Sequence, residues 1–186
     1  VAEIVSDHVT LTYWGVHGTL PVPGAGTLRR GGNTPCVSVE VSGEPLFVFD
    51  CGSGIKQLSD HLMASGVQRF SSRVFISHTH WDHIQSLPFF APLFVAGAEW
   101  HIYGPRGIGQ SLRDVLAAQM DYASFPVTLN AFAAQVHYHE IVEGGFSITA
   151  VHLTVRARIP GADAAAFEKA AEGAKAGCPV SKVLNA

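Results

Sequence analysis

Cysteine is scarce in this sequence, which has three cysteines among 186 residues. Cys36, Cys51 and Cys178 are widely separated and form no C-x-x-C pair. The spacing therefore suggests neither a disulfide framework nor a thiolate zinc site, and we expect reduced thiols.

Long apolar runs and an excess of basic residues are also missing. No apolar run approaches the roughly 18 residues of a membrane span, and the start lacks the pattern of a signal peptide. We therefore expect a cytoplasmic protein with no membrane partner. The formal net charge of −3 and a pI near 6.4 offer no basic surface for tight binding to nucleic acid. A local patch would still allow such binding, so a nucleic-acid partner is left open.

Strand and helix patterns alternate along the chain. A hydrophobic content of 47% over 186 residues is enough for a sizeable core. Period-two and period-3.6 patterns predict strands at about 9–14, 35–42, 45–50, 73–78, 99–105, 134–145 and 146–161, and helices within 53–66, 107–120 and 162–177. Ser53 is the expected N-cap of the first helix, and Gly66 its stop. The strand at 73–78 has the apolar run of a strand buried on both faces. The order of elements indicates the α/β class.

The composition changes near residue 143. The last 44 residues hold 11 of the alanines and one of the ten histidines, and their formal charge is +1 against −4 for residues 1–142. Neither an internal repeat nor a flexible linker is evident. We therefore predict two portions, residues 1–142 and residues 143–186.

The stretch "FISHTHWDH" places three histidines and an aspartate within six positions at the end of a predicted buried strand. If the strand continues slightly, His78, His80 and Asp82 leave one face and His83 points elsewhere. One metal ion could then take His78 and His80, and a second could take Asp82 and His83. Imidazole and carboxylate suit zinc, manganese or iron. Two such ions would make hydrolysis the natural chemistry. The alternative is a turn with surface histidines.

This motif resembles the H-x-H-x-D-H signature of the metallo-β-lactamase fold. "YWGVHGTLPVPG", "GGNTPC", "FVFDCGSGI" and "QMDYASFPV" extend the similarity to the phosphodiesterase and ribonuclease Z-like branch over about residues 9–142. The resemblance implies an αββα sandwich, here incomplete and followed by a C-terminal β-α segment. It also implies one or two zinc ions, with His78 and His80 at the first and Asp82 and His83 at the second. Asp82 is in addition the expected catalytic residue.

Further residues have a counterpart in that family. Asp50 matches an aspartate that supports the site from behind the ligands, although a carboxylate at a helix N-terminus beside Ser53 is an equal alternative. Gly31, Gly32 and Asn33 match a loop beside the site, and the alternative is a simple turn.

The resemblance stops at the later ligands. A complete member supplies a histidine in an L-x-H-P context, an aspartate that bridges two metals and a late histidine, and none is evident. Ile159 stands in the place of the first of these. His152 is the single histidine after residue 139, and we expect it to be an ordinary strand residue.

The tail, residues 143–186, resembles the C-terminal part of the OsmC/Ohr hydroperoxide reductases through its "AKAGCPVS" stretch. By that resemblance, Cys178 matches the second, resolving cysteine, while the earlier peroxidatic cysteine has no counterpart. The alternative for Cys178 is a small residue at a helix end.

Three functions follow from these patterns. The first is a metal-dependent hydrolase of a phosphodiester or similar ester, with a small-molecule or nucleotide substrate. The second is a thiol peroxidase of the OsmC/Ohr type, and the third is an inactive chimeric or truncated scaffold that binds metal. A homodimer is also expected under the second, because OsmC-like proteins build their sites between two chains.

Overall fold

A computed structural model describes residues 2–5, 9–66, 71–107 and 109–141, together with Ala165, Glu168, Lys169 and Glu172. The chain divides into two compact units, Val1–Ile141 and Val142–Ala186. The fold described below is that of the first unit. The predicted strand at 146–161 and the residues His152, Ile159 and Cys178 lie outside the described residues. Of the predicted helix at 162–177, the four described residues are helical.

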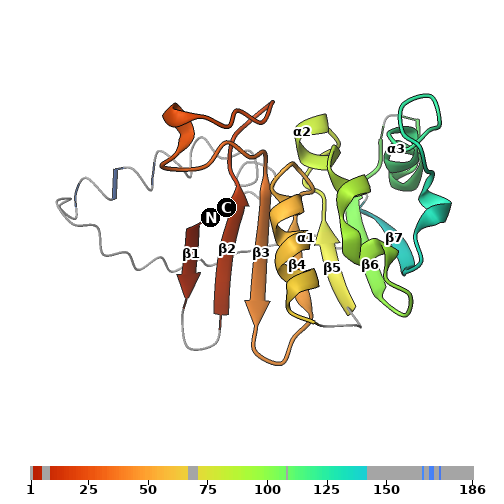
Figure 1. The fold of residues 1–186 in the computed structure, drawn as a ribbon, viewed down its shortest axis with the longest axis horizontal. Coiled ribbons are helices and arrows are strands. Elements are labelled where there is room, and N and C mark those ends of the chain that lie inside the picture. Colours follow the sequence, from red (N-terminus) through yellow and green to blue (C-terminus); the bar gives the residue numbers. More distant parts are fainter. Residues whose placement is uncertain are drawn as a thin grey trace. The chain divides into compact units, whose positions relative to one another are not determined.

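A seven-stranded mixed sheet is the centre of the first unit (Figure 1). Its strands follow chain order: β1 Ala2–Val5, β2 Val9–Gly15, β3 Cys36–Val41, β4 Leu46–Phe49, β5 Ser71–Phe75, β6 Glu99–Pro105 and β7 Gln135–Ile141. Strands β1 to β4 pair antiparallel, and β4 to β7 pair parallel. Each parallel pair needs a crossover, and these crossovers carry the three described α-helices.

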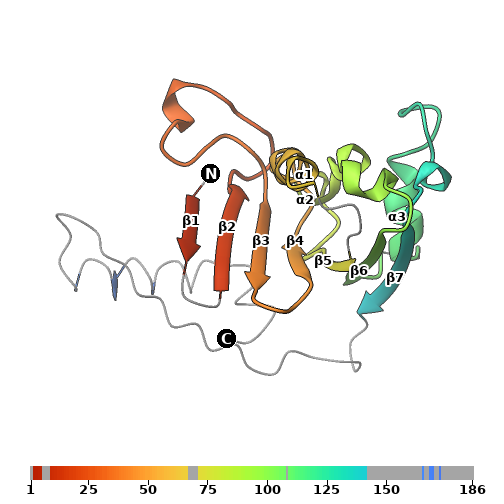
Figure 2. The ribbon, with the colours of Figure 1, turned by 60° about the horizontal axis from the view of Figure 1, so that its bottom comes forward.

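Three α-helices and four short 3₁₀ helices lie in the described connections. They are α1 Ile55–Ala64, α2 Trp81–Ile84 and α3 Leu112–Ala118, with η1 Ala25–Thr27, η2 Leu87–Phe89, η3 Ala91–Phe94 and η4 Leu129–Ala131. Figure 2 shows α1 end-on above the sheet. Val48, Val74, Trp100 and Ile102 point from the strands into the core on the face that α1 and α3 cover. The predicted α/β class is therefore confirmed.

Several predicted boundaries differ from the structure for local reasons. Strand β6 has the predicted bounds, but β5 ends at Phe75 rather than at residue 78. Burial of β5 on both faces is wrong, because Ser72 and Val74 are buried and alternate with more exposed neighbours. The helix predicted from 107 begins at Leu112, where Ser111 and Asp114 form a capping box. Strand β1 and helix α2 were not predicted.

Ser53 does not cap α1, because the N-cap residue is Gly54. The Ser53 hydroxyl instead accepts a hydrogen bond from the Thr34 N–H at 2.9 Å and donates to Asn33 Oδ1 at 3.2 Å. At the other end, α1 stops as predicted, with Gly66 at φ 72° beyond the C-cap.

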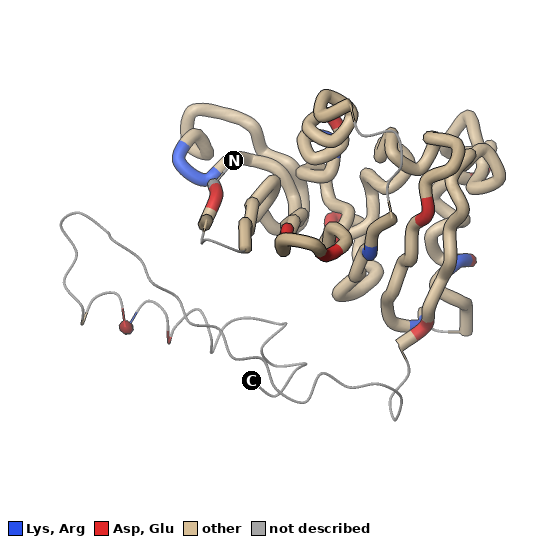
Figure 3. Tube along the Cα trace, turned by 90° about the horizontal axis from the view of Figure 1, so that it is seen from below, with Lys and Arg blue, Asp and Glu red and all other residues tan. Residues whose placement is uncertain are grey.

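Acidic and basic residues are spread along the described trace (Figure 3). Among the described residues, no helix is both long enough and apolar enough to cross a membrane.

Candidate functional site

Two loops meet at the carboxyl ends of β4 and β5, the usual place for ligand sites in parallel sheets. Backbone hydrogen bonds join the loops: the Cys51 N–H donates to the His83 carbonyl at 2.7 Å, and the Ser86 N–H to the Cys51 carbonyl at 3.0 Å. The Asp50 N–H donates to the Phe75 carbonyl at 2.9 Å. These bonds fix the motif loop against the residues that follow β4.

The structure brings the four motif residues His78, His80, Asp82 and His83 together. The ring of His78 lies 4.5 Å from that of His80 and 4.0 Å from that of His83, centroid to centroid. The Nε2 atom of His78 is 3.2 Å from His80 Nδ1, and His83 Nε2 is 3.5 Å from Asp82 Oδ2. Three imidazoles and one carboxylate therefore share one small region.

The predicted reason for this grouping is wrong. The strand does not continue to residue 82, because the chain leaves β5 at Phe75 and turns into α2, whose N-cap is His80. Asp82 and His83 belong to that short helix, and His83 lies against His78 rather than pointing elsewhere. A turn into a helix, not strand alternation, gathers the side chains.

Asp50 is the buried centre of the hydrogen bonds behind this loop. Its side chain accepts hydrogen bonds from the Ser77 N–H at 2.8 Å and from the Ser77 hydroxyl at 2.9 Å. Its Oδ2 lies 2.8 Å from His83 Nδ1. A proton on Nδ1 donates to this carboxylate and leaves the lone pair on Nε2, which faces Asp82. This arrangement favours the predicted supporting role of Asp50 over capping of α1.

Ser77 is a site residue that the sequence did not reveal. Its hydroxyl lies 3.1 Å from His78 Nδ1 and 3.3 Å from His83 Nδ1, in addition to its bonds with Asp50. One hydroxyl therefore contacts both rings and the supporting carboxylate. A serine directly before a histidine motif is too common to signal this role.

The charges of the loop shift three pKa values. Burial, followed by the nearby His83 and His80, lowers the pKa of His78 despite the two aspartates. Burial alone would lower the pKa of His83, but the hydrogen bond and charge of Asp50 and the charge of Asp82 outweigh it, so this pKa is raised. Burial would raise the pKa of Asp82, yet the hydrogen bond from Thr19 and the neighbouring histidines lower it. Asp82 is thus an anion at neutral pH.

The long loop between β2 and β3 contacts this region. The Thr19 N–H donates to Asp82 Oδ2 at 2.9 Å, and Thr19 has an unusual positive φ of 72°. Asn33 accepts the Ser53 hydroxyl bond, and Thr34 Oγ1 accepts bonds from the Ser53 N–H at 2.7 Å and Gln85 Nε2 at 3.0 Å. The side chain of Asn33, in the "GGN" stretch, thus bonds Ser53 and the Trp14 carbonyl rather than a motif residue.

Gly52 lies where these segments are closest. A Cβ atom there would lie within 3.0 Å of the Asp82 carbonyl oxygen, Thr34 Oγ1 and the Pro35 carbonyl oxygen. Since two of these atoms are backbone, Gly52→Ala is expected to destabilise the fold by about 1–3 kcal/mol, the usual range for overpacking. Denaturant unfolding measures this cost. Gly26→Ala, with open space around its Cβ, is the control; equal stability of both variants would contradict the packing.

The two described cysteines are buried, unpaired and fully enclosed. Cys36 and Cys51 are both 0% exposed. Burial, reinforced by nearby negative charge, raises the pKa of both thiols. Because the thiolate is the reactive form, we expect alkylation of Cys36 and Cys51 to be far slower in the native chain than in denaturant. Mass spectrometry of labelled peptides measures this, and rapid native labelling of either residue would contradict it.

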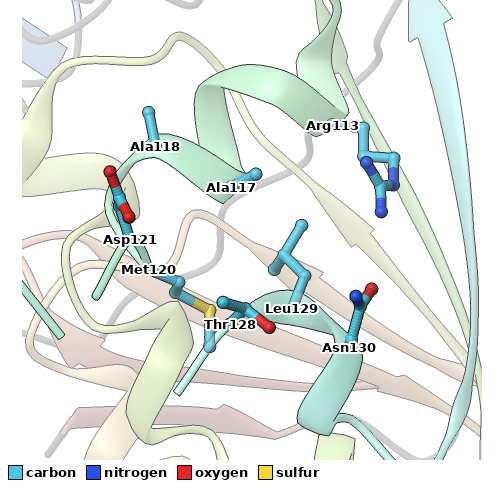
Figure 4. A pocket seen from close by; sticks show the side chains of 8 residues that line it. All are labelled: Arg113, Ala117, Ala118, Met120, Asp121, Thr128, Leu129 and Asn130. Carbon is cyan, nitrogen blue, oxygen red and sulfur yellow. The ribbon is translucent and has the colours of Figure 1, made fainter. Parts of the chain in front are cut away.

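A pocket of about 350 Å³ lies between α3 and η4 (Figure 4). Arg113, Asp121 and Asn130 are among its polar lining residues, and the buried Met120 closes part of it. None of the motif residues lines this pocket. Tyr122, which follows Asp121 in the chain, is 75% exposed.

Comparison with known proteins identifies the family. The profile of the beta-lactamase superfamily domain matches residues 47–177. The chain belongs to this superfamily. Within it, a ribonuclease Z of Staphylococcus carnosus is 29% identical over 148 residues, which are 77% of this chain and 45% of that protein. A ribonuclease BN of Cronobacter sakazakii is 33% identical over 102 residues, 53% of this chain and 30% of that protein.

A solved structure, described as a new diphosphatase from the PhnP family, shares 22% identity with a TM-score of 0.49, over 72% of this chain and 51% of that one. The chain also spans less than half of the length of each of the two ribonucleases named above. The superfamily match runs to residue 177 and includes most of the tail that resembles OsmC/Ohr proteins. The comparisons give that second resemblance no support.

Proposed function

We propose that this chain carries the metal-binding part of a metal-dependent phosphodiester hydrolase. His78 and His80 would hold one ion, and Asp82 and His83 a second. The observation that carries this proposal is the grouping of three imidazoles and a carboxylate on one loop, with His83 held at Nδ1 by the buried Asp50. Such a carboxylate–histidine pair is typical of metal-ligating histidines.

The donor set fits the ion that the fold implies. Neutral imidazole nitrogen and carboxylate oxygen are ligands for zinc, and manganese or iron would also accept them. The side chains of His78, Asp82 and His83 are partly exposed, so an ion and a substrate could reach them. When bound, zinc would supply Lewis-acid activation of a water molecule and of the phosphoryl oxygen.

The residues of the chain would contribute orientation and charge. The Asp50 carboxylate, 2.8 Å from His83 Nδ1, would keep a proton on that atom, so that Nε2 would present its lone pair. Asp82, the proposed catalytic residue, has a lowered pKa and remains ionised. A carboxylate whose pKa lies below its ordinary value suits a ligand that orients water better than a general base. The Thr19 N–H would fix one of its oxygens.

We propose a phosphodiester as the substrate class, by analogy with the relatives named ribonuclease Z and ribonuclease BN. The net charge of −3 and the scattered charges favour a small or nucleotide diester over a long RNA. The later ligands of a complete two-metal site would come from outside residues 2–141 or from a second copy of the chain in a homodimer.

Removal of the metal tests this proposal. A chelator is expected to abolish turnover of a chromogenic phosphodiester such as bis(p-nitrophenyl) phosphate, and added zinc to restore it. Manganese and iron are added in parallel to rank the metals, and a short RNA with a 3′ extension is tested as the alternative substrate. Turnover that survives complete removal of metal would contradict the proposal.

The two other candidate functions make different predictions in the same assays. An inactive scaffold would bind zinc but turn over neither diester. A thiol peroxidase would consume hydroperoxide in a way that depends on Cys178. Burial of Cys36 and Cys51 speaks against either of them as the missing peroxidatic thiol, so the hydrolase is the better supported function.

A further inference from the structure

A second group of ligand-type side chains lies on β6 and β7, away from the motif loop. Glu99 and His101 are two positions apart on β6, so their side chains lie on the same face of the sheet. Trp100 and Ile102 point to the opposite face and are buried in the core. His137 is the direct neighbour of His101 across the parallel pair. Figure 1 shows these two strands side by side at the edge of the described sheet.

The ligand atoms of the three residues converge. Glu99 Oε1 is 3.3 Å from His101 Nε2 and 3.2 Å from His137 Nε2, and the three atoms all lie within 4.8 Å of one another. Charge-assisted hydrogen bonds are shorter, at roughly 2.7–2.9 Å. Two ligands at the usual bond length from a tetrahedral zinc ion are about 3.3 Å apart. The two distances from Glu99 Oε1 therefore fit atoms that share an ion better than a close ion pair.

His139 holds His101 in the required orientation. Its Nε2 lies 3.0 Å from His101 Nδ1, so a proton on His101 Nδ1 can donate to it and leave the Nε2 lone pair facing Glu99. The His139 ring is itself stacked on Tyr103 at a centroid distance of 4.4 Å. His101 and His137 are stacked at 4.7 Å. The group thus has two ligands on one strand, one on the next, and a positioning residue behind one of them.

This group is separate from the motif loop. Glu99 pairs with Ser71 at the start of β5, whereas the motif loop follows Phe75 at the end of that strand. Four residues of strand span about 13 Å. The two groups are therefore at opposite ends of neighbouring strands and cannot share an ion.

We propose that Glu99, His101 and His137 form a second metal site for zinc or a similar borderline divalent cation. Two imidazoles and one carboxylate are a sufficient protein ligand set for zinc, with the fourth position left to water or to an added ligand. The side chains of Glu99 and His137 are each 45% exposed, so this position is open to solvent.

Zinc titration of the full chain, after removal of metal by a chelator, tests the site. Zinc is the only ligand added. Isothermal titration calorimetry measures its binding, and elemental analysis after gel filtration measures how much zinc each chain retains. His137→Gln and Glu99→Gln are expected to remove one zinc equivalent while leaving phosphodiester turnover unchanged. His139→Phe, which removes a positioning residue, is expected to weaken binding at this site by roughly 10–100-fold.

The control is His61→Ala, a change at an exposed histidine of α1 outside both groups. Its zinc content is expected to equal that of the unchanged chain. Circular dichroism of each variant reports whether it folds. The proposal is overturned if folded His137→Gln and Glu99→Gln bind as much zinc as the His61→Ala control, because Glu99 and the two histidines then form an ion pair network only.

Discussion

Replacement of His80 by alanine is expected to lower phosphodiester turnover by more than about a hundredfold. Loss of a residue that only orients a metal ligand costs roughly 10–100-fold, and loss of the ligand itself should cost more. His80 is exposed and its Nδ1 lies 3.2 Å from His78 Nε2. Its removal should therefore take away a ligand without opening the core. Steady-state kinetics on bis(p-nitrophenyl) phosphate at saturating zinc measures the effect.

His61→Ala is the matched control for this change, because it removes an exposed imidazole from α1 and not from the motif loop. Its turnover should equal that of the unchanged chain. Thermal unfolding of both variants shows whether the fold is retained. A folded His80→Ala chain with full turnover would exclude this histidine from the active site.

Asp50→Asn is expected to lower zinc affinity at the motif loop and turnover by roughly 10–100-fold, the cost of losing a carboxylate that orients a ligating histidine. Asparagine has nearly the same size and tolerates the positive φ of 61° that Asp50 adopts. Asparagine lacks the negative charge. Only one of its two terminal side-chain atoms is an acceptor, whereas both carboxylate oxygens of Asp50 contact Ser77 or His83. The backbone should therefore stay while His83 loses its orientation.

The control for Asp50→Asn is Asp60→Asn, which removes an exposed carboxylate paired with Lys56 on α1. Such a surface pair contributes little to stability. Calorimetric titration with zinc and steady-state kinetics are compared for both variants. If Asp50→Asn and Asp60→Asn bind zinc equally well and turn over equally fast, Asp50 has no role in supporting the site.

The sequence predicted the sheet better than the geometry of the loop that follows it. Strand β6 has the predicted bounds because "EWHIYGP" alternates buried and half-buried residues with period two. The motif residues were identified correctly as neighbours, but the strand was extended too far. Alternating histidines look the same in an extended strand and in a turn that leads into a four-residue helix such as α2.

Contacts between distant segments were beyond the reach of sequence patterns. Thr19 acts through its backbone N–H on Asp82, 63 residues away, and a backbone donor has no residue signature. Glu99, His101 and His137 were not predicted as a group, because the register between parallel strands is not visible in one sequence. Ser53 looked like an N-cap, but its hydroxyl bonds Thr34 and Asn33 instead.

The metal content of the motif loop tests the central claim most directly. Elemental analysis is made on a His137→Gln chain, which lacks a ligand of the second proposed site, with and without the additional changes His78→Ala and His80→Ala. We predict at least one zinc equivalent in the His137→Gln chain and a loss of zinc, together with turnover, in the triple variant. Equal zinc content in the two folded chains would contradict the assignment of His78 and His80 as ligands.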